Sequence, residues 1–576
     1  MTYRAYMAFL LRAHWPAFVL AVFVGLLTTI SPLVAEYRMG SLYQGVPPIV
    51  IDDQVYYLVR AQEALDGHPT LGNPYLLENK NMSSGQSWIP DMVLARVSML
   101  FGGLSEGRIV FGFVFPFLVI LISYAILYIL GRDKLISLAL AALADPGLVF
   151  QAFLRTPHPQ LLVLLFMVVL AVLLALQGRG KWWAIMAALI GGSLFYIYPF
   201  YWTYYVVMMG LAVPACFILI RESKAYQMLG LILAGSLTLG IPYFIEGYQT
   251  SKIPFYHEAL QRIGVIETHF PSGIFIVSIV TATLALGLWC WYKRIIPRTP
   301  ATVFIACTVA TGAVVVNQAV ITGMNFFFTG HYTQFVLFMC VFALGLCLPA
   351  LVNTYTSLHY RHAARWILAL VLIGITVWNA VPQVVHLATP QARDVAAERY
   401  GPILRWLNAN TKTDEVVYAD NLLSHYIPAY THNNVFFSTS AQQAFISNKE
   451  VQERFVRWHY FDGLTRESVI AGEADVFGAY YLGRWQHAMT TNRLRPLLGM
   501  PLDVVDRYPE SAIESLIEQE RLLQKQSFSS AIRGYEVRYL VWDTLLRPEW
   551  HANTVPGLRK LYEANSLEVY AVPPSQ

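Results

Sequence analysis

Two adjacent carboxylates, Asp52 and Asp53, lie early in the chain, where a loop gives way to a predicted helix. A carboxylate there can act as a general base that takes the proton from an attacking hydroxyl or amine in a group transfer. The pair can also bind a hard divalent cation, Mg²⁺ or Mn²⁺, through oxygen ligands. Asp is equally favoured at a helix N-terminus, where its charge suits the helix dipole, so capping is the structural alternative.

Tyr57 and Arg60 follow the two carboxylates, and with Tyr56 they mark one side of the predicted helix, which is expected to lie near the bilayer surface. An arginine there can bind a phosphate group bidentately. We therefore count Tyr57 and Arg60 as candidate substrate-binding residues.

Asp145 lies midway along an apolar segment and is followed by Pro146. A carboxylate at membrane depth costs about 2.5–3.5 kcal/mol on insertion scales, and such residues usually face a cavity or a partner. The proline breaks the helix, which predicts irregular backbone lining a cavity. The alternative is an Asp that is paired inside the helix bundle.

Arg155 and His158 follow at the end of the same segment, where the phosphate of a lipid would lie. Both are candidates for a phosphate-binding clamp, and an anchor for lipid headgroups is the structural alternative. His331, between two later apolar segments, can donate to a phosphate or transfer a proton, or it can be purely structural. Tyr198 belongs to a run of aromatic residues that an interfacial belt explains as well as sugar stacking does.

The amino-acid composition indicates which class of protein carries these candidate residues. Of 576 residues, 56% are hydrophobic and 13% are charged, against about 25% charged in an ordinary soluble domain. These values exclude a soluble enzyme, a disordered chain and a disulfide-rich secreted module. The net charge of +4 is spread between apolar runs, which excludes a nucleic-acid partner. The five cysteines lie inside apolar runs without CxxC spacing, so zinc and redox motifs are absent from the sequence.

Eleven apolar segments predict a polytopic α-helical membrane protein. They lie near 16–35, 109–130, 135–153, 160–176, 182–197, 202–220, 226–243, 272–292, 301–320, 334–352 and 366–383. Alternate loops are rich in Lys and Arg, which places the N-terminus in the cytoplasm and the C-terminus outside. No small-residue cleavage site follows the first segment, so we expect it to be an uncleaved span.

Two regions follow from this topology. Residues 1–384 are expected to form a transmembrane domain with a long first outer loop, 36–108. Residues 385–576 read as an extracytoplasmic mixed α/β domain with an at least partly parallel sheet, which ends in a strand, a helix over 556–564 and a last strand. This domain has no Gly-rich phosphate loop after a strand, which argues against a nucleotide site.

A long first outer loop with an acidic pair near its start resembles the GT-C superfamily of integral-membrane glycosyltransferases. The oligosaccharyltransferase branch carries an Asp, two aromatic residues and an Arg in a compact run, and Asp53, Tyr56, Tyr57 and Arg60 are similar at wider spacing. The protein-mannosyltransferase and lipid-A aminoarabinose-transferase branches are similar in layout. The resemblance implies a GT-C-like fold, a polyprenyl-phosphate-linked sugar as donor, and a first-loop Asp as catalytic base or metal ligand.

The resulting expectation is a multi-pass glycosyltransferase of the plasma (inner) membrane that passes a sugar to a glycan, lipid or protein acceptor on the outer face. Asp53 or Asp52 would deprotonate the acceptor, and Arg155, with Arg60, His158 and His331, would meet the donor phosphate. A single displacement would invert the anomeric carbon. The alternatives are a polymerase or ligase of lipid-linked glycans, and a transporter or membrane scaffold without enzymatic activity.

Overall fold

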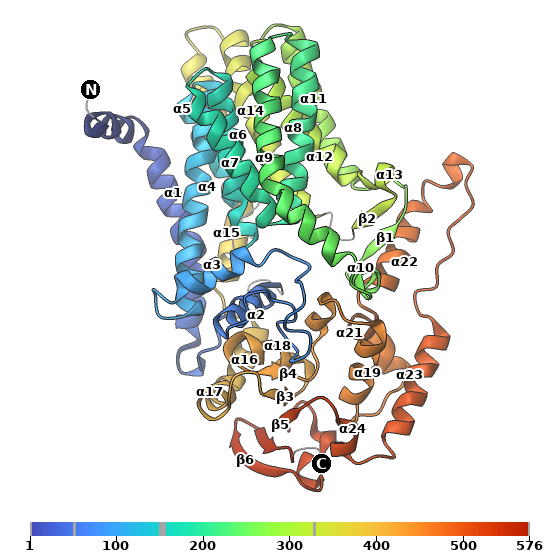
Figure 1. The fold of residues 1–576 in the computed structure, drawn as a ribbon. Coiled ribbons are helices and arrows are strands. Elements are labelled where there is room, and N and C mark those ends of the chain that lie inside the picture. Colours follow the sequence, from blue (N-terminus) through green and yellow to red (C-terminus); the bar gives the residue numbers. More distant parts are fainter. Residues whose placement is uncertain (1–2, 50–52, 149–156, 327–329, 574–576) are drawn as a thin grey trace.

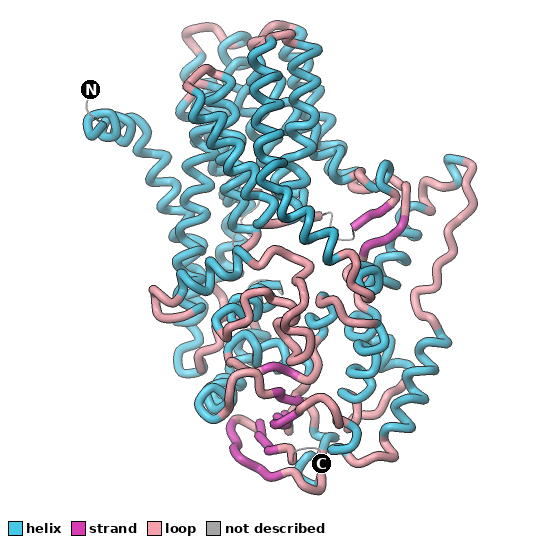
Figure 2. The backbone as a smooth tube through the Cα atoms, viewed as in Figure 1, coloured by secondary structure: helices cyan, strands magenta, loops and turns pink. Residues whose placement is uncertain are grey.

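The computed structural model describes residues 3–49, 53–148, 157–326 and 330–573 of the chain. Long helices pack side by side at one end, and a second domain with the larger sheet lies at the other (Figure 1). Among the described residues, strands occur in that second domain and in a small two-stranded antiparallel sheet between the two domains (Figure 2). We call the second domain, residues 392–573, the outer domain.

Helices cover every one of the eleven predicted membrane segments among the described residues. They are α1 (Tyr3–Met39), α4 (Leu104–Gly131), α5 (Lys134–Ala142), α6 (Leu162–Leu176), α7 (Lys181–Ser193), α8 (Pro199–Leu219), α9 (Ser223–Thr250), α11 (Ile274–Tyr292), α12 (Pro300–Val316), α14 (His331–Tyr355) and α15 (Arg361–Leu387). Seven are long and apolar enough to cross a membrane, and α6 and α12 are apolar but shorter. The multi-pass helical class is thus confirmed, while the exact number of spans and their orientation stay predictions.

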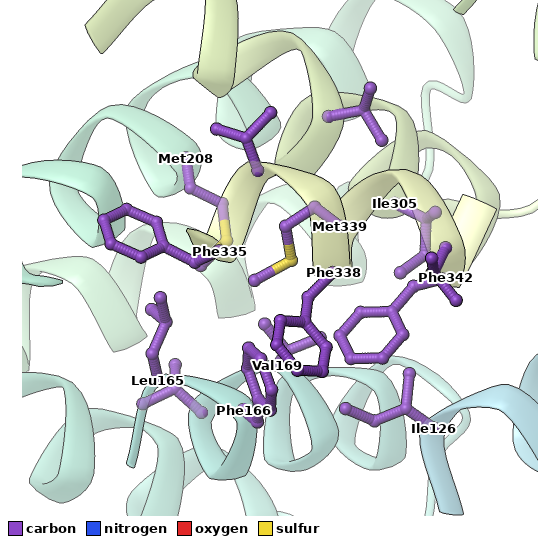
Figure 3. Close-up of a cluster of buried hydrophobic side chains, with 14 of the residues drawn as sticks. Ile126, Leu165, Phe166, Val169, Met208, Ile305, Phe335, Phe338, Met339 and Phe342 are labelled. Carbon is purple, nitrogen blue, oxygen red and sulfur yellow. The ribbon is translucent and has the colours of Figure 1, made fainter. Parts of the chain in front are cut away.

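The core of the membrane domain is a dry aromatic and aliphatic cluster centred on α6 and α14. Phe338 and Phe342 of α14 close on Phe166 of α6, with ring centroids 4.6 and 5.4 Å apart (Figure 3). Such tight interdigitation fixes the relative position of the helices, because a packed core resists even small volume changes. The ends of the helices, and the loops that connect them, are therefore held in fixed relative positions.

The third predicted segment shows the expected irregularity. After α5 the chain widens into a π-helical turn, η2 (Leu143–Gly147), which contains Asp145 and Pro146. Proline has no N–H for the helical ladder and its ring clashes with the preceding turn, which accounts for the wider geometry.

The outer domain has a five-stranded mixed sheet in the order β4-β3-β5-β7-β6. Its strands are β3 (Val416–Tyr418), β4 (Asn434–Val435), β5 (Val537–Asp543), β6 (Arg559–Ala564) and β7 (Leu567–Ala571). β3 runs parallel to β4 and β5, as the sequence predicted, and the β5–β7 and β7–β6 pairs are antiparallel. The helices around the sheet are α16 (Ala392–Ala397), α17 (Gly401–Asn410), α18 (Asn421–Tyr430), α19 (Asn448–Trp458), α20 (Arg466–Ala471), α21 (Glu473–Phe477), α22 (Tyr480–Thr491), α23 (Glu510–Leu523) and α24 (Phe528–Ala531).

The helix predicted over 556–564 is wrong, because most of that stretch forms strand β6. Asn565 and Ser566 both adopt positive φ, 50° and 63°, between β6 and β7. Two such residues make the tight turn that matches the twist of a hairpin, so β6 folds back on β7.

The first outer loop packs into the outer domain rather than lying free. It contains α2 (Asp53–Leu65) and α3 (Ile89–Ser98). Leu58 and Val59 of α2 share a hydrophobic cluster with Leu423 and Ile427 of α18. The carbonyl of Tyr75 also accepts a 2.9 Å hydrogen bond from the amide of Val435 in β4. The loop and the outer domain are therefore one folded unit.

A second connection runs from the loop after α9. This loop holds α10 (Tyr256–Arg262) and β1 (Val265–Glu267), and β1 pairs with β2 (Met324–Phe326), which follows α13 (Ala319–Thr322). Arg262 is buried and donates to the carbonyls of Gln442, Ala444 and Ile446 and to the Asn448 side chain. One arginine thus satisfies four acceptors in the outer domain.

Replacing Arg262 with Ala is expected to destabilise the docked outer domain by about 2–4 kcal/mol, because buried carbonyl acceptors lose a charged donor. Thermal unfolding of the purified chain, followed with limited proteolysis of the 440–450 segment, measures the loss. Arg538→Ala, which removes an exposed arginine from β5, is the matched control and should leave both readouts unchanged. Equal stability of the two variants would contradict this role for Arg262.

Candidate active site

Asp53 occupies the first turn of α2. Helix α2 lies at the side of the outer domain that faces the membrane helices (Figure 1). The Asp53 side chain is half-buried, whereas Tyr57, one turn later, is buried. The first turn of a helix stabilises negative charge, so this position suits a carboxylate that must be ionised to act as a base. Position in the first turn is compatible both with helix stabilisation and with catalysis.

A buried ionic network lies one further turn along α2. The Nε and Nη2 atoms of Arg60 lie 3.0 and 2.7 Å from Oδ2 of Asp91 in α3. Nε2 of His158 lies 3.0 Å from the same oxygen, and Nδ1 of His158 lies 3.0 Å from the carbonyl oxygen of Ile197. Asp91 and His158 have no exposed surface, and Arg60 is 1% exposed. The network joins the first outer loop to the segments before α6 and α8.

The charge of Asp91 is set by its two partners. Burial acts to raise the pKa of the Asp91 carboxyl, but the Arg60 guanidinium and the His158 ring outweigh it and hold that pKa below its ordinary value. Arg60 completes its hydrogen bonds with the Ser87 carbonyl, the Ser84 hydroxyl and the Tyr56 phenol. Arg60 is therefore engaged inside the protein.

Next to this network, tyrosine and histidine rings from four regions of the chain form a continuous cluster. The Tyr57 ring lies 4.9 Å from the His158 ring, and the His158 ring lies 5.8 Å from that of Tyr198. The Tyr198 hydroxyl lies 3.5 Å from Nδ1 of His331, the first residue of α14. Burial, then Tyr198 and then Asp53 keep the pKa of the Tyr57 phenol well above its usual range, so Tyr57 stays neutral. We call Asp53, Tyr57, His158, Tyr198 and His331 the junction cluster.

The structure thus brings together Asp53, Tyr57, Arg60, His158 and His331, five of the eight residues chosen from the sequence. Asp52 and Arg155 lie outside the described residues. Asp145 lies in η2, which packs against α15, and neither carboxyl oxygen meets a hydrogen-bond donor in the part of the chain that the structure describes. The roles assigned to all eight in substrate handling stay predictions.

Asp91 is the residue that sequence reasoning missed. Its signal was faint, a Pro-Asp pair at the start of a helix, which ordinary capping explains. A stronger hint was Arg60 itself, because an arginine on the buried face of a helix needs a counter-ion. Tyr198 was seen only as one of many interfacial aromatic residues, and its place beside His331 is a tertiary feature.

The donor set for a divalent cation is incomplete among the described residues. Asp53 supplies carboxylate oxygens of the kind that Mg²⁺ and Mn²⁺ take. Within the described ranges, however, no three His, Cys, Asp or Glu side chains gather at one place.

Comparisons with known proteins identify the fold. No family model matches the chain, and no curated protein matches it. The oligosaccharyltransferase of Archaeoglobus fulgidus in its apo form matches with a TM-score of 0.50 and 12% identity, over 97% of this chain and 74% of that one. ArnT from Cupriavidus metallidurans in the apo state has a TM-score of 0.48 and 12% identity, over 96% and 99% of the two chains. The chain therefore shares the fold of this oligosaccharyltransferase, a GT-C enzyme, and the resemblance carried by the first outer loop is confirmed at the level of fold.

Asp91→Asn is expected to destabilise the protein by about 3–5 kcal/mol, because it leaves the buried Arg60 charge without its counter-ion. Thermal unfolding in detergent measures the change. Asp506→Asn, the same chemical change at an exposed position, should have no effect. Unfolding of Asp91→Asn at the temperature of this control would show that the network contributes nothing to stability.

Proposed function

We propose that the chain is a membrane glycosyltransferase that transfers a sugar from a polyprenyl-phosphate-linked donor to an acceptor on the outer face of the membrane. The observation that carries the proposal is the junction cluster, in which a half-buried carboxylate lies with two tyrosines and two histidines where the first outer loop meets the membrane helices. Its support is the GT-C fold, which the Archaeoglobus fulgidus oligosaccharyltransferase shares.

Asp53 is the proposed base. The acceptor hydroxyl or amine gives its proton to the Asp53 carboxylate while its oxygen or nitrogen forms a bond to the anomeric carbon. The bond between that carbon and the phosphate oxygen breaks, and the electron pair leaves with the polyprenyl phosphate. The phosphate needs no strong acid, because it is already stable as an anion. A single displacement of this kind inverts the anomeric configuration.

His331 and Tyr198 are the proposed contacts for the donor phosphate. Their polar atoms meet at the start of α14, where an imidazole and a phenol can both donate hydrogen bonds to phosphate oxygens. Arg155 belongs to the same proposal from its place in the sequence. His158 is better described as a positioning residue, because its Nε2 contacts Asp91 and its Nδ1 contacts Ile197.

Arg60 supports the base indirectly. Through Asp91 it fixes α2 against α3, and α2 carries Asp53 at its first turn. Precise placement of a base is worth orders of magnitude in rate, so a fixed helix under Asp53 has a direct chemical use. The outer domain, which shares a core with α2, is the proposed site of acceptor selection.

Asp53→Asn should lower the transfer rate by about 10²–10⁴-fold, the usual loss when a general base is removed. The assay uses the full chain in lipid nanodiscs with a panel of polyprenyl-phosphate-linked sugars, and binding of donor is measured separately and should persist. Asp66→Asn, the same change just beyond the other end of α2, is the matched control and should keep wild-type transfer.

Full activity in Asp53→Asn and in the Asp52→Asn, Asp53→Asn double variant would overturn the proposed base. The product of the reaction distinguishes the alternative functions. A ladder of long glycans on gels identifies a polymerase, and a single large transferred glycan identifies a ligase. Substrate flux in proteoliposomes without any covalent product would replace the glycosyltransferase with a transporter.

His331→Phe tests the phosphate contact, because Phe keeps a ring against Phe200, 4.9 Å away, and removes both nitrogens. We expect a donor KM about tenfold higher with a smaller change in kcat, the loss of roughly one charge-assisted hydrogen bond. Kinetics over a range of donor concentrations distinguish the two parameters. An unchanged KM would remove His331 from donor binding.

A further inference from the structure

The loop between α22 and α23 exposes an unusual set of apolar side chains. Over residues 494–504 the exposed fractions are 39% for Leu494, 81% for Leu497, 65% for Leu498, 41% for Met500, 59% for Leu502 and 90% for Val504. Single exposed apolar residues are common, but a contiguous group of this kind marks a surface that contacts a partner or a membrane. We call residues 494–504 the apolar tip.

The base of the tip is closed by hydrogen bonds. The Asn492 amide donates to the carbonyl of Asp503 at 2.9 Å and its oxygen accepts from the amide of Asp503 at 2.8 Å. The guanidinium of Arg495 lies 3.6 Å from the Asp503 carboxylate. Asn492 and Asp503 are thus held together at the base of the loop, and the short helix η8 (Pro496–Leu498) lies between them. We call this projecting loop, residues 492–504, the finger.

The finger stands beside the membrane domain. His487 of α22 lies 2.8 Å from the Thr268 hydroxyl, and the Arg495 guanidinium lies 5.0 Å from the centre of the Phe270 ring. Thr268 and Phe270 come just before the membrane helix α11. Figure 1 shows the finger rising from α22 to the level of α13, at the edge of the helix bundle.

The membrane helices expose apolar side chains at this same level. Ile274 and Phe275 at the start of α11 are 78% and 70% exposed, and Ile321 of α13 is 81% exposed. In a membrane-spanning bundle such residues face lipid. The apolar tip therefore lies near lipid-facing side chains, since Arg495 contacts Phe270, which comes just before α11.

We propose that the apolar tip inserts into the bilayer leaflet on the side of the outer domain and anchors that domain to the lipid surface. The side chains enter, while the irregular backbone stays among the headgroups, because hydrocarbon cannot satisfy its free N–H and C=O groups. Arg493 is exposed at the base of the finger, where a cation meets lipid phosphates. Leu497 and Leu498 then lie in the boundary between headgroups and acyl chains, as interfacial apolar residues do.

The test is a measurement of depth on the full chain in lipid nanodiscs. Leu497→Cys and Leu502→Cys carry a nitroxide label, and its collisions with oxygen, which concentrates in lipid, are compared with collisions with a water-soluble nickel chelate. The five native cysteines are buried, and protein without an added cysteine, treated with the same reagent, gives the background. Leu545→Cys is the matched control, since Leu545 is 66% exposed and follows just after β5. The sheet that contains β5 lies at the end of the molecule away from the membrane helices (Figure 1).

We expect the oxygen-to-nickel ratio to be several-fold higher at positions 497 and 502 than at 545, and to fall to the control value when lipid is replaced by a soluble amphipathic polymer. The same ratio at all three positions in nanodiscs would overturn the proposal. So would spin–spin broadening at position 497 that disappears on dilution with unlabelled protein, because it would show that a second copy of the chain covers the tip. These readouts need no transfer activity, so the result is independent of the proposed function.

Discussion

Asp91 has no contact with water, and a single oxygen of its carboxylate meets both the Arg60 guanidinium and the His158 ring. Three parts of the chain that are distant in sequence supply these groups: α2, α3 and the segment before α6. A buried charge tolerates little movement of its partners, because each lost contact leaves an unsolvated ion. The position of α2 relative to the membrane helices is thereby fixed, and with it the position of Asp53.

The outer domain is likewise held in place by contacts with specific partners. Its contacts with the membrane domain are of different kinds: a hydrophobic core shared with α2, an arginine from α10 bound to three carbonyls, and a finger beside α11. Apolar contacts alone would allow the outer domain to slide over α2, whereas the hydrogen bonds of Arg262 form in only one relative position of the two domains. Domains joined by a small polar interface usually move relative to each other. Here three separate attachments oppose such motion and keep the junction cluster assembled.

The sequence predicted the features that depend on local composition and failed where tertiary contacts decide. Runs of apolar residues predicted the membrane helices, since crossing a bilayer demands length and hydrophobicity regardless of neighbours. The acidic start of the first loop pointed to Asp53, Tyr57 and Arg60 because their types are chemically distinctive. Asp91 and the neighbourhood of Tyr198 could not be predicted, because both depend on which segments meet in space. Strand β6 was mistaken for a helix because a two-residue turn, Asn565-Ser566, decided its pairing.

The contact between Tyr75 and β4 has a consequence for how these proteins coexist at high density in a membrane. β4 is the first strand of the sheet, and a bare outermost strand invites pairing with another chain. The carbonyl of Tyr75 occupies one amide of that strand, so the first outer loop acts as a cover over it. On the opposite margin, β6 begins with Arg559 and Lys560, and charged side chains on an edge strand discourage an incoming strand. Both edges of the sheet are thus protected against self-association, one by a backbone hydrogen bond from the first outer loop and the other by charged side chains.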